Sequence, residues 1–222
     1  MSIIEGRPAR LLSKQGITPY LFHYGGFKIV VHKDVFPPDL SSSSLPLFDV
    51  IRQYEPRLAL DMGCGTGILS LQLSRVSHSV FAVDNHPLAI ENAKQNIAIN
   101  EVNNVIVARS DLFAGISLKY SFDLIVFNHP YYPSLKNKNF GIDKSGGASL
   151  IRRFLLDSIR YLASGGRIVM PFSEFAGRPN DPLPISARMG FQGSVIWSAL
   201  DSLGCHCVYE LRYPSKSSIR LR

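Results

Sequence analysis

The spacing of hydrophobic positions divides most of the chain into alternating strand-like and helix-like segments. Short, nearly continuous apolar runs predict buried strands at 57–63, 79–84, 105–111, 122–128 and 167–172. Apolar residues at intervals of three and four predict helices at 67–76, 87–100 and 148–163. Strands that alternate with helices in this way form a parallel sheet, so the pattern predicts an α/β fold with helices on both faces.

Both ends of the chain depart from this alternation and predict antiparallel strands. At 17–35, two β-rich runs flank a Gly-Gly pair, which suits the tight turn of a β-hairpin, and a short helix at 45–54 follows. Near the C-terminus, the runs SVIWSAL and CHCVYELRY predict an antiparallel pair. We therefore expect one domain over residues 1–222, in which the N-terminal hairpin precedes a core at 45–213.

Composition narrows the setting in which the protein works. No apolar run is long enough to cross a membrane, and the first residues lack the apolar block of a secretory signal, so we expect a cytoplasmic protein. Three cysteines are too few for a disulfide framework and fit a reducing compartment. The run Cys205-His206-Cys207 lacks the four ligands and the wider spacing of a structural zinc site, so we expect no metal.

Candidate ligand-binding residues stand where predicted strands end. The first strand of the alternating region ends in DMGCGTG, at 61–67, whose glycines allow a sharp turn and a close approach of the backbone to a ligand. The spacing is G-x-G-x-G, because Ile68 interrupts the G-x-G-x-x-G of dinucleotide-binding enzymes. Asp84 and Asp111 end the next two strands, at the edge where ligands collect in such sheets. Three acids and a glycine turn suit a ligand with a cationic amino-acid group, a ribose and an adenine.

The D-x-G-C-G-T-G loop closely resembles the cofactor loop of class I S-adenosylmethionine-dependent methyltransferases. The resemblance implies a Rossmann-like, seven-stranded, mostly parallel sheet with an antiparallel last strand, and S-adenosyl-L-methionine as the cofactor. Asp61 and the glycines would face the methionine part, Asp84 the ribose, and Asp111 with Leu112 the adenine. The cofactor-binding residues that it implies are Asp61, Gly63, Gly65, Thr66, Gly67, Asp84, Asn85, Asp111, Leu112 and Asn128.

The strand predicted at 122–128 leads into FNHPYY, an unusual end for a buried strand. An amide or aromatic amine is a poor nucleophile because its lone pair is delocalised, and two acceptors bonded to its N–H groups counteract this. Asn128 offers a side-chain oxygen, and residue 129 offers a backbone carbonyl. Tyr131 offers a ring that can orient a planar group, and Pro130 stiffens the turn. The candidate catalytic residues are therefore Asn128, His129, Pro130 and Tyr131.

FNHPYY resembles the N-P-P-Y motif of methyltransferases that act on planar nitrogens. The flanking segments VFPPDLSSSSLPLFDVI and GIDKSGGASLIRRFL are similar to the HemK-like branch of the methyltransferase small domain family, whose members modify a glutamine of release factors. The resemblance covers about 27–175. His129 replaces the first proline of the motif, and two interpretations stay open. It is a tolerated substitution with its side chain turned aside, or it contacts an altered substrate and accepts a proton near neutral pH.

The sequence thus predicts an enzyme that transfers a methyl group to a planar nitrogen, either the amide of a protein glutamine or the amino group of a nucleic-acid base. A basic cluster at 136–160 favours a macromolecular partner, such as a release factor-like protein, RNA or DNA, and no membrane. The cluster consists of Lys136, Lys138, Lys144, Arg152, Arg153 and Arg160. The alternatives are a small-molecule N-methyltransferase that acts on a guanidinium or amide, and a non-catalytic subunit that binds the cofactor. A nicotinamide-dependent oxidoreductase would require a different glycine spacing.

Overall fold

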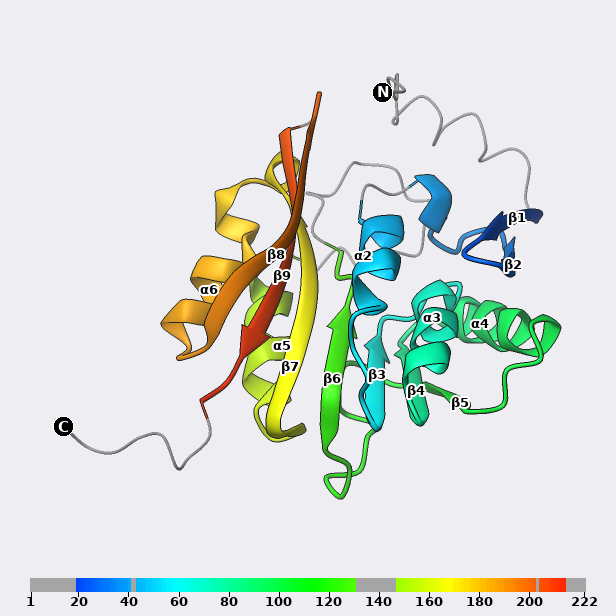
Figure 1. Ribbon diagram of the computed structural model, residues 1–222, viewed down its shortest axis with the longest axis horizontal. Coiled ribbons are helices and arrows are strands. Elements are labelled where there is room, and N and C mark those ends of the chain that lie inside the picture. Colours follow the sequence, from blue (N-terminus) through cyan, green and yellow to red (C-terminus); the bar gives the residue numbers. More distant parts are fainter. Residues whose placement is uncertain (1–18, 41–42, 131–146, 203, 215–222) are drawn as a thin grey trace.

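A seven-stranded sheet with the strand order β5-β4-β3-β6-β7-β9-β8 forms the centre of the computed structural model (Figure 1). The structure describes residues 19–40, 43–130, 147–202 and 204–214. The strands of this sheet are β3 (Leu58–Met62), β4 (Ser79–Asp84), β5 (Val105–Arg109), β6 (Phe122–Phe127), β7 (Leu162–Ser173), β8 (Gln192–Asp201) and β9 (Gly204–Arg212). Strands β3 to β7 pair in parallel, and β9 pairs antiparallel to both β7 and β8. The predicted fold class is confirmed, including the antiparallel last strand.

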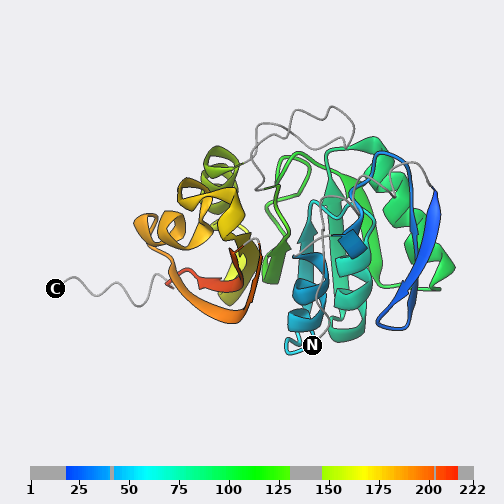
Figure 2. The same cartoon turned by 90° about the horizontal axis from the view of Figure 1, so that it is seen from above.

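Helices cover both faces of the sheet, as the view from above shows (Figure 2). Helices α2, α3 and α4 lie on one face, and α5 and α6 lie on the other. The helices are α2 (Ser44–Ile51), α3 (Ile68–Val76), α4 (Pro87–Ile99), α5 (Ala148–Ser158) and α6 (Pro182–Arg188), with short 3-10 turns η1 (Pro38–Leu40), η2 (Glu174–Ala176) and η3 (Arg178–Asn180). Within the described part of the chain, no helix has the length and apolar character that a membrane span requires.

The continuous apolar runs of the sequence are explained by burial on both faces. In β6, Leu124 and Val126 pack with the core under α2 and α3, whereas Ile125 and Phe127 pack with the core under α5. Neighbouring side chains of a strand point to opposite faces, so most positions of a strand covered on both sides are apolar. The polar side chains of β3 and β6, Asp61 and Asp123, lie next to the strand ends.

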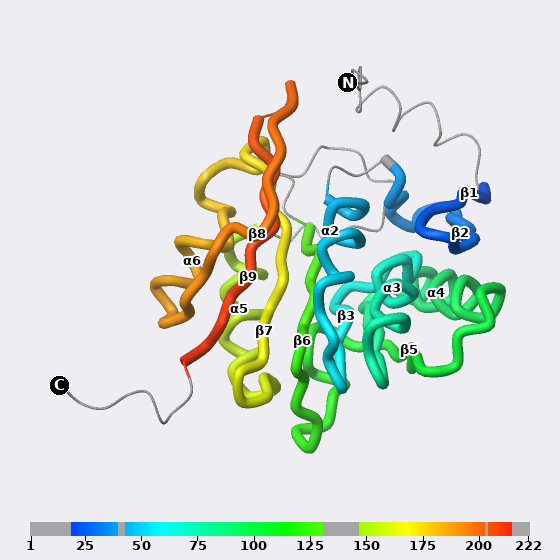
Figure 3. Tube along the Cα trace, in the orientation of Figure 1, coloured from blue at the N-terminus to red at the C-terminus, as the bar shows by residue number. Residues whose placement is uncertain are grey.

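The N-terminal hairpin consists of β1 (Tyr20–Tyr24) and β2 (Phe27–Val31), and the tube view shows it beside α4 rather than within the central sheet (Figure 3). Two asparagines of α4 and the asparagine that caps its C-terminus, spaced four apart, bond to the outer backbone edge of β2. Asn100 Oδ1 accepts from the Lys28 N–H at 2.9 Å, and Asn96 Oδ1 accepts from the Val30 N–H at 2.8 Å. Asn92 Oδ1 accepts from the N–H of His32, the residue after β2, at 3.0 Å.

This asparagine ladder works because two periodicities nearly match. Four residues of α-helix rise about 6.0 Å, and two residues of strand rise about 6.6 Å. The ladder therefore supplies the hydrogen bonds that a third strand would have made. Asn96 does more, because its Nδ2 donates to the carbonyls of both Val30 and Thr66, each at 2.8 Å. A fully buried amide thus joins the hairpin to the loop that follows β3.

The sequence-based boundaries were wrong in one region. The helix predicted to run to residue 163 ends at Ser158, and β7 begins at Leu162 rather than at 167. Tyr161 lies in the turn between them, where it is buried and its hydroxyl donates to the Ile116 carbonyl at 3.0 Å. Gly165 has a positive φ of 77° and lies inside β7. Helix α6 was not predicted from the sequence.

The asparagine ladder predicts unequal effects of two alanine substitutions. Asn96→Ala leaves the Val30 N–H and the Thr66 carbonyl buried without their partner, and we expect it to lower the free energy of unfolding by about 3 kcal/mol. Asn100→Ala acts at the exposed end of the ladder, where water replaces the amide, and should cost about 1 kcal/mol or less. Urea denaturation of both variants measures the difference, and equal costs would contradict the role given to Asn96.

Candidate functional site

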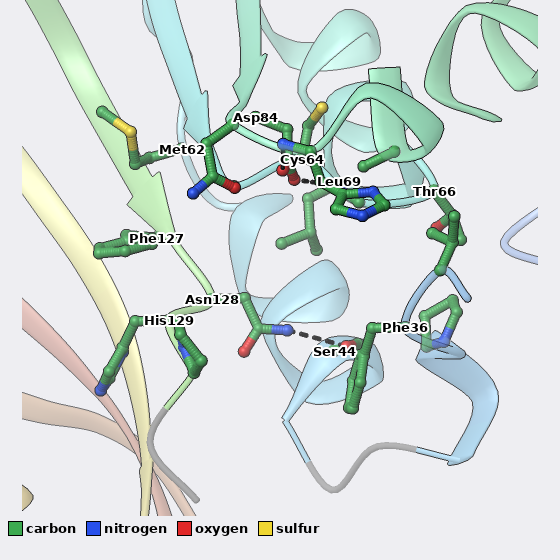
Figure 4. A pocket seen from close by; sticks show the side chains of 18 of the residues that line it. Phe36, Ser44, Met62, Cys64, Thr66, Leu69, Asp84, Phe127, Asn128 and His129 are labelled. Atoms are coloured by element: carbon green, nitrogen blue, oxygen red, sulfur yellow. Dashed lines mark hydrogen bonds between the residues drawn. The ribbon is translucent and has the colours of Figure 1, made fainter. Parts of the chain in front are cut away.

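A cavity of about 200 Å³ lies where the carboxyl ends of β3, β4 and β6 meet. Its lining includes the loop after β3, the ends of β4 and β6, the 110–112 segment after β5, the N-terminus of α2, and residues between β2 and η1 such as Phe36. Figure 4 shows Asp84 and Asn128 on different strand ends beside this one space. The hairpin and its ladder therefore hold one wall of the cavity, since β2 leads directly into the Phe36 segment.

The conformation of the loop after β3 depends on its glycines. Gly63, Gly65 and Gly67 all have positive φ values, which other residues adopt only with strain. At Gly67, a Cβ would also stand 3.2 Å from the backbone of Ala93 in α4. The Gly65 N–H points to β4 and donates to Asp84 Oδ2 at 3.0 Å. The loop is thus pressed between α4 and the end of β4 in a shape that only glycine permits.

Two aspartates and a leucine line the cavity near the ends of β4 and β5. Asp84 Oδ1 accepts from the His86 N–H at 2.9 Å, so both carboxylate oxygens are fixed by backbone while keeping lone pairs for a ligand hydroxyl. Leu112 is buried with a positive φ of 47° and lines the cavity. Asp111 also lines it, but its carboxylate is exposed and pairs with Arg153 of α5.

Asp61 lies at the base of the loop and is fully buried. Its Oδ2 accepts from the Ser70 hydroxyl at 2.5 Å, whereas no donor among the described residues reaches its Oδ1. The pKa of Asp61 is raised to about 7, with burial as the largest cause; the charge of Asp84 contributes to the rise, whereas hydrogen bonds from Ser70 oppose it. The carboxylate does not line the cavity, so it acts on a ligand mainly through its charge.

Asn128 follows β6 and is bonded to two serines at the start of α2. Ser43 Oγ donates to Asn128 Oδ1 at 2.9 Å, and Asn128 Nδ2 donates to Ser44 Oγ at 2.8 Å (Figure 4). Neither serine was predicted as a site residue. A serine just before a helix suits a cap, and such a pattern carries no sign of a contact made 85 residues away.

His129 is buried, and its ring points away from the Asn128 side chain (Figure 4). The ring lies beside Phe127, with 5.7 Å between the ring centroids. Burial lowers the pKa of His129 to about 3, although a hydrogen bond with the Phe127 backbone opposes the shift. A neutral, inward-facing imidazole favours the interpretation of a tolerated substitution over that of a proton acceptor near neutral pH.

Most predicted site residues meet at this cavity. The lining includes these predicted residues: Gly63, Gly65, Thr66, Asp84, Asn85, Asp111, Leu112, Asn128, His129 and Pro130. Gly67 and Asp61 support the loop from behind instead of lining it. Tyr131, like Lys136, Lys138 and Lys144 of the basic cluster, lies outside the described residues. The described residues contain no group of three metal-binding side chains.

The acidic and apolar side chains in and beside the cavity fit S-adenosylmethionine. An unsatisfied buried carboxylate oxygen of Asp61 favours a cation nearby, because an unpaired buried acceptor is costly. The oriented Asp84 carboxylate suits a pair of ribose hydroxyls, and Leu112 offers an apolar surface for a base. Two acids near the glycine loop would repel the pyrophosphate of a dinucleotide, which disfavours the nicotinamide alternative.

Comparisons with known proteins show which family and which fold the chain resembles. The sequence profile of the methyltransferase small domain matches residues 26–181. A candidate protein N5-glutamine methyltransferase of Methanocaldococcus jannaschii is 30% identical over 68% of this chain and 79% of its own length. The release factor glutamine methyltransferase of Aliivibrio fischeri is 32% identical over 50% of this chain, which spans only 44% of that protein. A methyltransferase structure from Pyrococcus furiosus has the same fold, with a TM-score of 0.65 at 20% identity over 94% of this chain and 98% of that one.

Asp61→Asn is expected to stabilise the ligand-free protein while weakening its binding of S-adenosylmethionine. The raised pKa means that the folded state holds the Asp61 proton more tightly than the unfolded chain does. Its contribution to stability is therefore complete below the unfolded pKa of 3.8 and is lost as the pH rises through about 7. Between pH 5 and pH 8 the variant should gain roughly 2–3 kcal/mol relative to the native chain.

Urea denaturation at the two pH values measures this gain, and calorimetric titration measures the affinity. We expect Asp61→Asn to bind S-adenosylmethionine about tenfold more weakly, because a negative charge at the base of the loop is removed. A variant that is less stable than the native chain at both pH values, or that binds equally well, would contradict the role of Asp61.

The environment of His129 predicts that its imidazole does not titrate near neutral pH. Because the charged form is disfavoured by burial, the NMR signals of the His129 ring should stay constant from pH 8 to pH 5. The signals are assigned by their loss in His129→Phe. A titration midpoint near the ordinary value of 6.5 would instead support a proton-accepting role.

Proposed function

The chain belongs to the methyltransferase small domain family, and from that premise we propose that it methylates the side-chain amide nitrogen of a glutamine in a protein, with S-adenosylmethionine as the donor. The observation that carries the proposal is the position of Asn128. Its carboxamide lies at the end of β6 and lines the same cavity as Asp84 and the glycine loop. An amide-binding group thus stands next to the surface that suits the donor.

The residues that would hold the donor have separate tasks. The Asp84 carboxylate, fixed by two backbone N–H groups, would accept hydrogen bonds from the ribose. Leu112 would pack against the adenine, and the charge of Asp61 would attract the methionine amino group. When bound, the cofactor supplies a methyl group on a positively charged sulfur, an electrophile that needs only a correctly placed nitrogen.

Asn128 and the residues after it would prepare the acceptor nitrogen. Asn128 Oδ1 and the carbonyl of His129 would accept the two N–H groups of the glutamine amide, favouring a tetrahedral nitrogen whose lone pair is no longer delocalised into the carbonyl. The nitrogen held in this way would take the methyl carbon as the bond from that carbon to sulfur breaks, and the sulfur would keep the electron pair. One N–H proton passes to water, because methylation makes the nitrogen acidic, so no protein base is required.

A macromolecular substrate is supported by two independent features, and the first of them favours a protein. The M. jannaschii relative, which this chain covers over 79% of its length, is named as a protein N5-glutamine methyltransferase. Arg152 and Arg153 lie on α5, the helix that follows β6 in the chain, and Arg160 lies in the turn after it; all three are exposed. These charges suit an acidic or phosphate-bearing macromolecule, and RNA, DNA or a small amide is the competing class of acceptor.

Asn128→Ala is expected to lower methyl transfer by at least about a hundredfold, because an acceptor bonded to the nucleophile is lost. The affinity for S-adenosylmethionine should remain close to that of the native chain, since Asp61 and Asp84 are unchanged. The measurement is incorporation of labelled methyl groups into a release factor, RNA, DNA or a metabolite pool, followed by mass spectrometry of the product.

Asn103→Ala is the matched control, because Asn103 is an exposed asparagine that does not line the cavity. It should transfer methyl groups at the native rate. Tight cofactor binding without transfer to any acceptor would favour the non-catalytic subunit. Transfer only to a metabolite would favour the small-molecule enzyme.

A further inference from the structure

Both polar atoms of the Asn128 carboxamide make hydrogen bonds to two consecutive serines at the start of α2. Ser43 and Ser44 come from the start of α2, and both are buried, with 7% and 2% of their surface exposed. Ser43 Oγ donates to Asn128 Oδ1, and Ser44 Oγ accepts from Asn128 Nδ2. The dashed line in Figure 4 marks the second of these bonds across the cavity wall. Two consecutive hydroxyls therefore hold a single side chain.

Ser43 gives up the usual bond of a residue at its position. It is the N-cap of α2, where a serine hydroxyl normally accepts from a backbone N–H of the first turn. In α2, a helix that is described throughout, the Ser43 hydroxyl makes no such capping bond. It donates to Asn128 instead. Departures from local helix rules are expected where a residue serves a site rather than its own helix.

The two bonds leave Asn128 oriented and still able to bind. A carboxamide oxygen has two lone pairs, and Ser43 occupies one of them. The other remains for a ligand in the cavity that Asn128 lines. Donation from Nδ2 to Ser44 polarises the amide and makes Oδ1 a stronger acceptor, whereas the bond from Ser43 fixes the direction in which the second lone pair points.

We propose that Ser43 and Ser44 are positioning residues for methyl transfer, which fix the Asn128 carboxamide so that the second lone pair of Oδ1 faces the N–H of the acceptor. The proposal rests on the proposed function, because it takes Asn128 as the group that binds the acceptor nitrogen. A residue that orients a reacting pair acts on turnover, whereas the cofactor surface formed by Asp84 and Leu112 is untouched.

The kinetic test compares Ser43→Ala and Ser44→Ala with the native chain. Each variant should lower kcat about tenfold, the loss expected when one hydrogen bond that holds Asn128 is removed, while the KM for S-adenosylmethionine stays within about twofold. Ser43→Thr keeps the hydroxyl and should restore most of kcat. Ser186→Ala, which removes a buried serine hydroxyl of α6 from its bond to the Leu183 carbonyl, controls for loss of a buried hydroxyl.

A merely structural role predicts another result. The thermal midpoint would fall in Ser43→Ala and Ser44→Ala as it does in Ser186→Ala, with kcat unchanged at a temperature where each variant is folded. That result would overturn the proposal. An equal rise in KM for the cofactor in both variants would also overturn it, since the serines would then be shaping the donor surface.

A readout that needs no acceptor separates this proposal from the proposed function. In the NMR spectrum of protein with 15N-labelled asparagine, the Nδ2 signal of Asn128 is assigned by its loss in Asn128→Ala. We expect slow solvent exchange of its protons in the native chain and at least about tenfold faster exchange in Ser44→Ala. If the native chain transfers no methyl group, the proposed function fails, but the exchange measurement still tests whether the serines hold the Asn128 carboxamide. Unchanged exchange in Ser44→Ala would refute that role.

Discussion

The arrangement of the whole site depends on one buried amide, the side chain of Asn96. Its three hydrogen bonds join β2, α4 and the loop after β3, segments that are far apart in the sequence. A buried polar group is stabilising only when all of its partners are present, so this amide fixes the hairpin in one register on α4. Because β2 leads into the Phe36 segment, fixing the hairpin also fixes a wall of the cavity. An appendage to the central sheet thereby becomes part of its ligand site.

Asp61 shows the opposite situation, a buried group whose partners are incomplete. The Ser70 hydroxyl satisfies one oxygen and leaves the other without a donor among the described residues, while Asp84 adds a second negative charge nearby. Such a group weakens the ligand-free fold, yet it is the feature that favours a cationic ligand. The asparagine ladder and the two apolar cores supply the stability that allows this carboxylate to remain buried.

Features set by the local sequence could be predicted, whereas features set by contacts between distant residues could not. The strands, most helices and the glycine loop follow from periodicity and from φ values that only glycine adopts easily, so the sheet and most cavity residues could be predicted. The boundary at 158–162 could not, because Tyr161 takes its position from a bond to Ile116 and not from its neighbours. Ser43 and Asn96 were missed for the same reason, since a serine before a helix and an asparagine within one have ordinary local explanations.

The same distinction applies to residue 129, where the segment after β6 differs from the N-P-P-Y motif that it resembles. The backbone carbonyl of residue 129 is available whatever the side chain, and the His129 ring packs beside Phe127, away from Asn128. The rigidity lost with the proline does not need to come from the turn itself, because the N-terminus of α2 holds the carboxamide from the opposite wall. Because Ser43 and Ser44 belong to a second element, the orientation of Asn128 depends less on the stiffness of its own loop. The histidine is therefore compatible with a working site, provided that the serines keep their contacts.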